Sequence, residues 1–443
     1  MNTLITDFGA KGDGVTSNTA AIQSAIDECF KTGGGTVTVP AGVYVTGTLR
    51  LQSGTELHLE HNSVIKATDD LSEYNELNEY PQNFGAPREK WSSQHLIIAV
   101  EKENVGISGS GTIEGCGDSF FGGELHRISN FCWPEGYYET AEGAPDRPGQ
   151  MICFIECRHV EVSGITLKNS SSWNLFLHGS EYVKINGIKV LNEKTHANSD
   201  GIDIDCCRYV TVSDCIIDTG DDCIAIRGDS KRLKSEKRCE YIAVSNCVLS
   251  NSTCAVRIGV GTGEIHHINI SCLILARTGE GITLQTDFHG NGNTHITDIN
   301  ITDVIGDEVG SPIQMFANNN KIERVTFSDF RSNCMNKIHI ESEKCGISDL
   351  VLRNVDVYDK TADFPLPETA GEERGENVMI INGVKRLVLD NVRVFGNGDR
   401  RFSRKDDAVI FNSSVLRDDI CFISRDEQNE VKKRGKTEEK RNQ

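Results

Sequence analysis

The segment from 198 to 229 is rich in aspartate, and three of its carboxylates have a spacing that suits acid–base chemistry. Asp200 comes 21 residues before Asp221, and Asp222 follows directly. Carboxylates brought within several ångströms of one another repel, so the pKa of at least one of them rises. A protonated carboxyl beside an ionised one can protonate a leaving oxygen and activate water, as cleavage of a glycosidic bond requires. The other aspartates of the segment are typical of tight turns.

These three side chains meet only if residues about 21 apart in sequence become neighbours in space. Adjacent residues of a strand point to opposite faces, so bringing Asp221 and Asp222 to one cleft also requires a local bend. Gly220, directly before them, favours such a bend. The fold must therefore return the chain to nearly the same place about once every 21 residues.

A repeat along the chain predicts such a fold. Each unit is a short apolar alternation, then Ser, Asn or Asp beside a small residue, then a second apolar run, as in VEVSGITLKN at 160–169. The apolar residue before the polar pair recurs every 23 to 37 residues, at Val162, Ile185, Val212, Val244, Ile270, Ile301, Phe327, Leu352 and Leu389. This period indicates a solenoid, since a four-stranded propeller blade needs about 40 residues or more.

Two or three short strands joined by polar turns form one coil of a parallel β-helix, in which stacked Val, Ile, Leu and Cys line a continuous core. We therefore predict an all-β, single-stranded parallel β-helix as one domain over 1–429. Its open end needs a cover, and residues 17–30 predict a helix whose N-terminus is capped by the side chain of Ser17 or Asn18 and which ends at Gly33. The apolar stripe of this helix is predicted to contain Ala21, Ile22, Ala25, Ile26, Cys29 and Phe30. The charged tail 430–443 is predicted to be disordered.

The strand rhythm stops between about 116 and 150, where glycine and aromatic residues gather. Long irregular insertions on a rigid scaffold often form binding walls. Trp133, Tyr137 and Tyr138 have rings that can stack on a sugar, or that can instead fix the loop to the solenoid. If the insertion closes one end of the cleft, it favours action at a chain end.

Composition excludes several kinds of partner. The 65 acidic and 46 basic residues give a formal charge of −19, which argues against binding to nucleic acid or an anionic membrane. The sequence has no window resembling a membrane-spanning helix, and its start has no leader. The 16 cysteines form no pair of CxxC motifs, and we interpret most of them as reduced core residues. This favours the cytoplasm, the alternative being a secreted or periplasmic protein whose leader has been removed.

Two acidic motifs carry a family resemblance. Asn198-Ser199-Asp200-Gly201 resembles the Asn-Thr-Asp motif of glycoside hydrolase family 28, the polygalacturonase-like enzymes of the pectin lyase-like superfamily, and Gly220-Asp221-Asp222-Cys223 resembles its Gly/Gln-Asp-Asp motif. The segments at 7–14, 33–44, 109–115 and 147–157 are also similar, so the resemblance covers most of 5–310. It implies a right-handed β-helix and hydrolysis with inversion. It also implies Asp221 as general acid, with Asp200 and Asp222 holding and activating water.

The sequence departs from the family at two motifs. The family's Gly-His-Gly falls in NSTCAVRIG at 251–259, where Thr253 stands near the expected histidine. The Arg-Ile-Lys that grips a galacturonate carboxylate falls in GITLQT at 281–286, which offers Thr283 and Gln285. These neutral side chains can bind hydroxyl groups but cannot neutralise a carboxylate as an arginine does.

Other residues are candidates for the missing groups. Arg257 and Arg227 can replace the cations, although either, and Arg227 in particular, can instead pair with a nearby aspartate. His266, His267 and His289 are candidates for the histidine, and each has a structural or solvated alternative. The predicted substrate-binding set is Asn198, Arg257, Thr283, Gln285, Trp173, Trp133 and Glu280, in which Trp173 resembles a family tryptophan that packs under the cleft and Glu280 is alternatively an exposed turn residue.

We therefore predict an inverting glycoside hydrolase that acts on pectin-derived or related plant oligosaccharides, without metal or organic cofactor, from a chain end. The loss of the Arg/Lys motif leaves a hydrolase of a neutral or unusual sugar as an alternative. A calcium-dependent lyase on the same solenoid is a second alternative, although no obvious basic residue stands beside the aspartates to abstract a sugar proton. A noncatalytic carbohydrate-binding β-helix is the alternative from another class, and it has no use for the paired Asp221 and Asp222.

Overall fold

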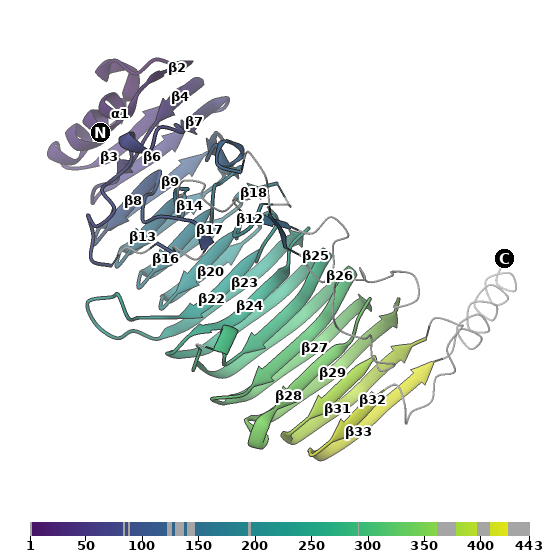
Figure 1. Cartoon of the computed structure of the whole chain (residues 1–443). Helices are drawn as coiled ribbons and strands as arrows, with labels where there is room; N and C mark the ends of the chain where they lie inside the picture. The colour runs from purple at the N-terminus through teal and green to yellow at the C-terminus, as the bar shows by residue number, and fades with distance from the viewer. Residues whose placement is uncertain are drawn as a thin grey trace, which may run out of the picture.

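Short parallel strands stack along the chain, and each pairs with strands one coil away in sequence (Figure 1). Strand β14 (Arg158–Ser163), for example, lies between β9 (Glu103–Gly109) and β17 (Glu181–Asn186) and is parallel to both. The protein is therefore a parallel β-helix, as the repeat predicted. The computed structural model describes residues 2–82, 85–86, 89–121, 126–128, 137–139, 147–193, 196–290, 292–360, 378–396 and 408–423.

The strands are short in the first half of the chain and often run on through bends in the second. The first coils contain β1 (Asn2–Leu4), β2 (Asp13–Ser17), β3 (Gly35–Val39), β4 (Gly42–Thr46), β5 (Leu49–Arg50), β6 (Thr55–Leu59), β7 (Ser63–Ala67), β8 (Ile97–Val100), β9 and β10 (Thr112–Glu114). The middle coils contain β13 (Ile152–Ile155), β14, β15 (Thr166–Lys168), β16 (Leu175–His178), β17, β18 (Lys189–Leu191), β19 (Ile202–Asp205), β20 (Arg208–Ser213), β21 (Ile216–Asp218), β22 (Ile224–Gly228), β23 (Cys239–Ser250) and β24 (Cys254–Gly261).

The last coils contain β25 (Glu264–Gln285), β26 (His295–Ala317), β27 (Ile322–Cys334), β28 (Ile338–Ser342), β29 (Ile347–Asp359), β30 (Met379–Asn382), β31 (Val384–Phe395), β32 (Ala408–Phe411) and β33 (Ser414–Ile423). A separate antiparallel hairpin, β11 (His126–Ile128) with β12 (Tyr137–Glu139), lies within the predicted insertion. Single 3-10 turns occur at η1 (Ile5–Phe8), η2 (Leu71–Glu73), η4 (Gly117–Ser119), η5 (Phe288–Gly290) and η6 (Glu343–Cys345).

The register confirms the sequence repeat residue by residue. Its markers pair directly from coil to coil in the order Val162, Ile185, Val212, Val244, Ile270, Ile301, Phe327, Leu352 and Leu389. The side chains of these residues are fully buried. Stacked apolar residues at one position of every coil thus form a continuous core along the solenoid.

The polar part of the repeat has its own structural cause. Two residues after each marker the chain passes through a left-handed residue, with φ between 51° and 73°, at Gly164, Gly187, Asp214, Asn246, Cys272, Asp303, Asp329, Asn354 and Asn391. Gly, Asn and Asp adopt this conformation most readily, so they recur at this turn. Cys272 occupies one of these turn positions and is exposed, unlike most of the described cysteines, which are buried free thiols.

Helix α1 (Thr19–Lys31) covers the N-terminal end of the solenoid (Figure 1). The helix was predicted at 17–30, and its buried residues are Ile22, Ala25, Ile26 and Cys29. The expectation that Phe30 lies in this stripe was wrong, since its side chain is 47% exposed. At 100° per residue, Phe30 has drifted to the edge of the buried face.

The start of this helix also differs from the predicted side-chain cap. Asn18 is the residue before the helix, but its side chain does not bond to the first turn. Its Oδ1 accepts from the backbone N–H of Lys11 at 2.6 Å, and its Nδ2 donates to the carbonyl of Thr16 at 2.6 Å. Asn18 therefore holds the preceding loop against the helix.

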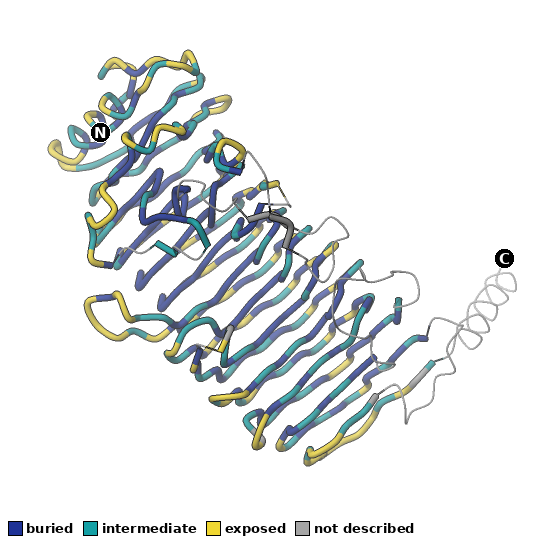
Figure 2. Tube along the Cα trace, viewed as in Figure 1, coloured by how far each residue is buried: buried dark blue, intermediate teal, exposed yellow. Residues whose placement is uncertain are grey.

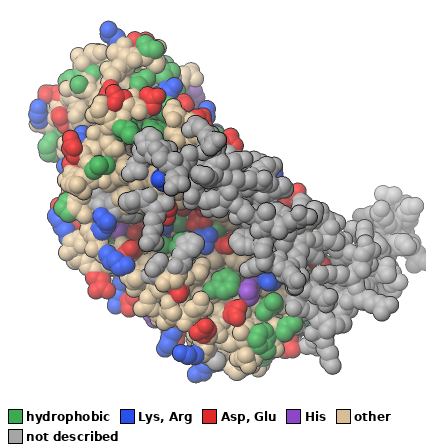
Figure 3. Space-filling view, viewed as in Figure 1, with side chains coloured by type: hydrophobic (Ala, Val, Ile, Leu, Met, Phe, Trp, Pro, Cys, Tyr) green, Lys and Arg blue, Asp and Glu red, His purple; other side chains and the backbone are tan. Residues whose placement is uncertain are grey.

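Burial follows the strands, and exposure is concentrated at the bends between them (Figure 2). On the face shown in Figure 3, acidic and basic side chains are interspersed rather than gathered in a basic patch. Across the described ranges, no helix has the length and apolar character that crossing a membrane requires.

Candidate active site

Asp200, Asp221 and Asp222 come from two adjacent coils. Asp200 lies just before β19, and the Asp221–Asp222 pair lies just before β22. These strands pair with an offset of 22 residues, which places Asp200 opposite Asp222, and the N–H of Gly201 donates to the carbonyl of Asp222 at 2.8 Å. One oxygen from each of the three carboxyl groups lies within 4.8 Å of the other two. The solenoid thus brings the three predicted aspartates into one cluster.

Asp221 is the partly exposed member of the cluster. Its Oδ1 accepts from the hydroxyl of Thr253 at 2.8 Å, and its Oδ2 accepts from the backbone N–H of Asn198 at 3.1 Å. Burial and the neighbouring charge of Asp222 raise the pKa of Asp221 to about 6, although these hydrogen bonds oppose the shift. At mildly acidic pH this group holds a proton that it can give away.

Asp200 is deeply placed and only 5% exposed. Its backbone carbonyl accepts from the N–H of Asn174 at 2.8 Å, which ties it to the preceding coil. Its Oδ1 has no hydrogen-bond partner among the described residues. Burial first, and then the charge of Asp221, raise the pKa of Asp200. A buried carboxyl oxygen that still needs a partner is suited to holding a water molecule.

Asp222 has the opposite environment, because an arginine holds it. Arg257 Nε lies 2.6 Å from Asp222 Oδ2, and Arg257 Nη2 lies 3.2 Å from Asp222 Oδ1. The same Nη2 lies 3.4 Å from Glu280 Oε2, which also accepts from the hydroxyl of Thr283 at 2.7 Å. One connected network therefore joins four residues that the sequence analysis named as candidates: Asp222, Arg257, Glu280 and Thr283.

The role of Asn198 depends on Arg147, which sequence reasoning missed. Arg147 is fully buried, and its Nη2 donates to Asn198 Oδ1 at 2.8 Å and to the carbonyl of Glu89 at 3.1 Å. Asn198 adopts a left-handed conformation with φ 56°, which turns its N–H toward Asp221. The backbone of Asn198 thus contacts the aspartate cluster, while its side chain is fixed by the hydrogen bond from Arg147. The isolated Arg-Pro-Gly at 147–149 was the available sequence signal.

Comparison with known proteins agrees with this geometry. The profile of glycosyl hydrolases family 28 matches residues 29–357, a stretch that includes the three aspartates and their partners. The chain belongs to this family. The protein is therefore a glycoside hydrolase of the polygalacturonase-like kind, and the resemblance seen in the acidic motifs is confirmed.

Several relatives extend the comparison over most of the hydrolase. A probable polygalacturonase of Vitis vinifera is 32% identical over 233 residues, which are 50% of this chain and 43% of that protein. A probable polygalacturonase of Arabidopsis thaliana is 24% identical over 412 residues, 87% of this chain and 80% of that protein. The solved exopolygalacturonase of Thermotoga maritima is 22% identical, with a TM-score of 0.63 over 96% of this chain and 92% of that one. The solved structure shares the fold of the hydrolase.

A second group of charges lies beside the cluster on the same sheet face of the hydrolase. Arg227 Nη1 lies 3.5 Å from Asp203 Oδ1, and its guanidinium carbon lies 4.4 Å from the ring centroid of Trp173. His178 Nδ1 lies 3.1 Å from Asp205 Oδ2. Arg227 therefore pairs with an aspartate rather than standing free, and its side chain is 16% exposed. Trp173 is 5% exposed and supports this layer from beneath.

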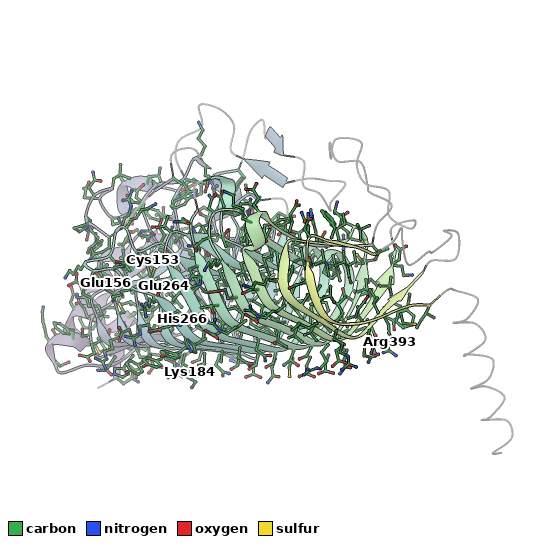
Figure 4. The ribbon with its side chains drawn as sticks, turned by 90° about the horizontal axis from the view of Figure 1, so that it is seen from below. Cys153, Glu156, Lys184, Glu264, His266 and Arg393 are labelled. Carbon is green, nitrogen blue, oxygen red and sulfur yellow. The ribbon has the colours of Figure 1, made fainter. Side chains whose placement is uncertain are left out.

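One side of this sheet face is closed by an apolar cluster, called here the aromatic wall. It consists of Trp91, Ile98, Cys153, Ile155, Trp173 and Phe176, with Tyr80 packed against it. The rings of Trp91 and Trp173 are 5.4 Å apart, and Cys153 is labelled in Figure 4. Phe176 lies directly beside Asp203 in the register of β16 and β19. The wall therefore ends within two coils of the aspartate cluster, on its N-terminal side.

Trp91 brings a further segment to this wall, besides the insertion predicted at 116–150. Trp91 belongs to the irregular stretch between β7 and β8, whereas most of 116–150, including Trp133, lies outside the described residues. The aromatic residues of this earlier stretch, which also include Tyr74 and Tyr80, are the sequence signal that could have located this cluster.

The opposite side of the same face is more open. From Arg257 the register continues through Thr283, Gln314 and His339, of which the last two are partly exposed. Gln285 is also partly exposed, and its Nε2 donates to the carbonyl of Asp287 at 3.0 Å. The side beyond Thr283 therefore offers neutral hydrogen-bonding groups along the solenoid.

The histidines considered as replacements occupy another part of the hydrolase. His266, labelled in Figure 4, lies 3.2 Å from Glu240 Oε2, and His267 is its neighbour in the part of β25 that pairs with β23. The aspartate cluster instead adjoins β24. His289 has a side chain outside the described set. Thr253, near the position expected for the histidine, is the residue that contacts both Asp221 and Asp222.

Proposed function

We propose that the hydrolase cleaves pectin-derived or related plant oligosaccharides with inversion, from a chain end. The observation that carries this proposal is the unequal environment of three clustered carboxyl groups. Asp221 has a pKa raised to about 6 and is partly exposed, whereas Asp222 is held by an arginine. Acid and base roles divide between groups whose surroundings separate them in this way.

In the proposed reaction Asp221 protonates the glycosidic oxygen as the bond to the anomeric carbon breaks. Asp200 and Asp222 hold a water molecule, and Asp222 accepts its proton while the water oxygen bonds to that carbon. The hydrogen bond from Thr253 keeps the Asp221 carboxyl turned toward its neighbours. The open Oδ1 of Asp200 and the fixed carboxylate of Asp222 provide acceptors for the water.

Burial favours inversion over a covalent intermediate. The carboxyl oxygens lie within 4.8 Å, closer than the separation of about 6.5–9.5 Å common in inverting glycosidases, so distance alone points the other way. A nucleophilic carboxylate, however, must reach the sugar carbon directly. Asp200 and Asp222 are each 5% exposed, and both oxygens of Asp222 are already bound by Arg257. A water molecule reaches such groups more readily than a sugar ring does.

The aromatic wall supports action at a chain end. It covers the sheet face on one side of the cluster, so a long chain extends only toward the more open side, over Thr283 and Gln314. Solved family relatives from Thermotoga maritima and Yersinia enterocolitica bear the name exopolygalacturonase, which accords with this direction.

The network around Thr283 favours a second candidate, a hydrolase of a neutral or unusual sugar glycoside. Arg257 is bound to Asp222 and Glu280, so one cation already serves two carboxylates. Thr283 and Gln285 add no charge. A sugar carboxylate placed here meets a net negative surrounding, whereas hydroxyl groups find acceptors and donors.

A panel of substrates tests both candidates. Nitrophenyl glycosides of galacturonate, rhamnose, galactose and arabinose, together with oligogalacturonides, are incubated with the protein and the products are separated. Release of single residues from oligogalacturonides supports the first candidate, and turnover restricted to neutral glycosides supports the second. Random internal cuts contradict action at a chain end. An unsaturated product that absorbs in the ultraviolet, lost with chelator, would replace hydrolysis by a lyase reaction.

A further inference from the structure

Arg257 reaches the aspartate cluster from the segment 251–259, where the family's Gly-His-Gly motif falls, although arginine is not part of that motif. It lies on β24, where the register pairs it with Ala225 of β22 on one side and Thr283 of β25 on the other. Its side chain is only 11% exposed. A guanidinium group thus occupies the site one coil before the position at which the Arg-Ile-Lys motif was expected.

Arg257 makes a two-point contact with Asp222. Nε and Nη2 meet the two oxygens of Asp222 as a fork, at 2.6 Å and 3.2 Å. Glu280 approaches Nη2 at 3.4 Å from the next coil, and the Phe288 ring lies 5.1 Å from the guanidinium carbon. Such two-point pairing fixes the plane of a carboxylate as well as its charge.

The environment of Asp222 contains several other titratable and charged groups. Near it are Asp221 on its own turn, Asp200 and Asp203 from the preceding coil, Arg227 from β22, Arg257 and Cys254 from β24, and Cys223 beside it in sequence, while Glu280 of β25 contacts Arg257. Four of the named groups are carboxyl groups: Asp221, Asp200, Asp203 and Glu280. The guanidinium of Arg257 is in hydrogen-bond contact with Asp222, so its positive charge offsets this crowding of negative groups.

We propose that Arg257 is a positioning residue that keeps Asp222 ionised and oriented as the water-activating base, and that Glu280 holds Arg257 in place. This inference rests on the proposed hydrolysis, but it assigns Arg257 a partner within the protein rather than a substrate carboxylate. Asp222 takes up both donors of the fork, and Glu280 shares one of them. The separation of roles between Asp221 and Asp222 then depends on one guanidinium group.

Kinetics of Arg257→Gln and Arg257→Lys as a function of pH test the inference on the glycoside that the wild type hydrolyses best. For Arg257→Gln, kcat falls about 100-fold or more and KM changes much less, as expected when a group that serves the transition state is lost. The acidic limb of kcat/KM moves to higher pH, because the positive charge in contact with the base is removed. Arg257→Lys keeps the charge but not the fork, so its acidic limb stays near that of the wild type while kcat falls about 10-fold.

Arg324→Gln is the matched control. Arg324 forms the same kind of fork with Asp298, at 2.6 Å and 2.9 Å, on the exposed surface of β27. Its loss leaves kcat, KM and the acidic limb unchanged. A raised KM with an unchanged kcat and acidic limb in Arg257→Gln would instead assign Arg257 to substrate binding and overturn the inference.

A measurement without substrate separates this inference from the proposed function. Carbon-13 labelled aspartate reports the environment of each carboxyl group by NMR, and Asp222→Asn identifies the signal of Asp222. In Arg257→Gln this signal shifts from its wild-type position, because the carboxylate loses both hydrogen bonds of the fork. Identical Asp222 signals in the two proteins overturn the inference, whatever the enzyme hydrolyses. A wild type that is inactive on the whole panel contradicts the proposed function alone.

Discussion

The hydroxyl of Thr253 donates to Asp221 Oδ1 at 2.8 Å, across the boundary between two coils. This hydrogen bond favours the ionised form of Asp221 and so lowers its pKa, against the larger effect of burial. Thr253 stands near the place where the family has a histidine. The proton affinity of the proposed acid is therefore tuned here by a neutral hydroxyl.

Replacing Thr253 by Val keeps the shape and removes the donor. The pKa of Asp221 rises, so the alkaline limb of kcat/KM moves to higher pH, by about half a unit to one unit. Thr302→Val is the control, since Thr302 forms a similar bond to exposed Asp303 at 3.2 Å on the outer surface. An alkaline limb that stays in place in Thr253→Val would show that this hydroxyl does not act on the group whose ionisation limits the rate.

Asp221→Asn, Asp200→Asn and Asp222→Asn each remove a carboxylate with little change in shape. Each variant loses turnover by about 100-fold to 10,000-fold, while oligosaccharide binding measured by calorimetry is retained. Asp303→Asn, on the outer surface, retains full activity. Unchanged activity in the Asp221 and Asp222 variants would favour the noncatalytic binding alternative.

The raised pKa of Asp221 predicts two quantities that both fall as the pH rises. Protonated Asp221 is the acid, so kcat/KM falls as the pH rises through about 6. The same shift favours the folded state below about pH 4, and this contribution to the free energy of unfolding is lost as the pH rises through 6. Urea unfolding at pH 4 and pH 7 measures it, and Asp221→Asn removes about 1–3 kcal/mol of the difference. A pH difference in stability that is the same in the variant and the wild type is incompatible with this assignment.

Proton NMR of the first product distinguishes the two stereochemical outcomes. We expect the initially released reducing sugar to carry the anomeric configuration opposite to that of the substrate, because water, not a buried carboxylate, reaches the anomeric carbon. The spectrum is recorded in the first minutes, before mutarotation mixes the anomers. Initial release of the retained anomer would assign a nucleophilic role to one of the aspartates.

Trp91→Ala opens the aromatic wall. Trp91 is 1% exposed, so the change costs about 3–5 kcal/mol of stability, measured by thermal or urea unfolding. The variant that remains folded releases longer oligosaccharides than the wild type, because a chain can then extend past the cluster. Phe30→Ala on exposed α1 is the control for both readouts. Products of unchanged length from Trp91→Ala would place the barrier to internal cleavage elsewhere.

The solenoid was predictable because its physics repeats. An apolar residue at one position of every coil, followed by a residue that tolerates a left-handed turn, leaves a periodic trace in the sequence, and Val162 through Leu389 pair as that trace predicted. The spacing of Asp200 and Asp221 could be compared with the same period, so the cluster of carboxylates was also accessible from the sequence.

The sequence by itself thus determined the fold, the family and which carboxylates meet. Only the tertiary structure decided their unequal environments. Side-chain contacts between neighbouring coils create these environments. They include the pairing of Arg257 with Asp222, the hydrogen bond from Thr253 to Asp221 and the packing of Trp91 in the aromatic wall. Coil lengths vary because turns and insertions differ in length. Which side chains meet is therefore set by the hydrogen-bonded register of the strands and by the direction of each side chain, and a spacing in sequence specifies neither.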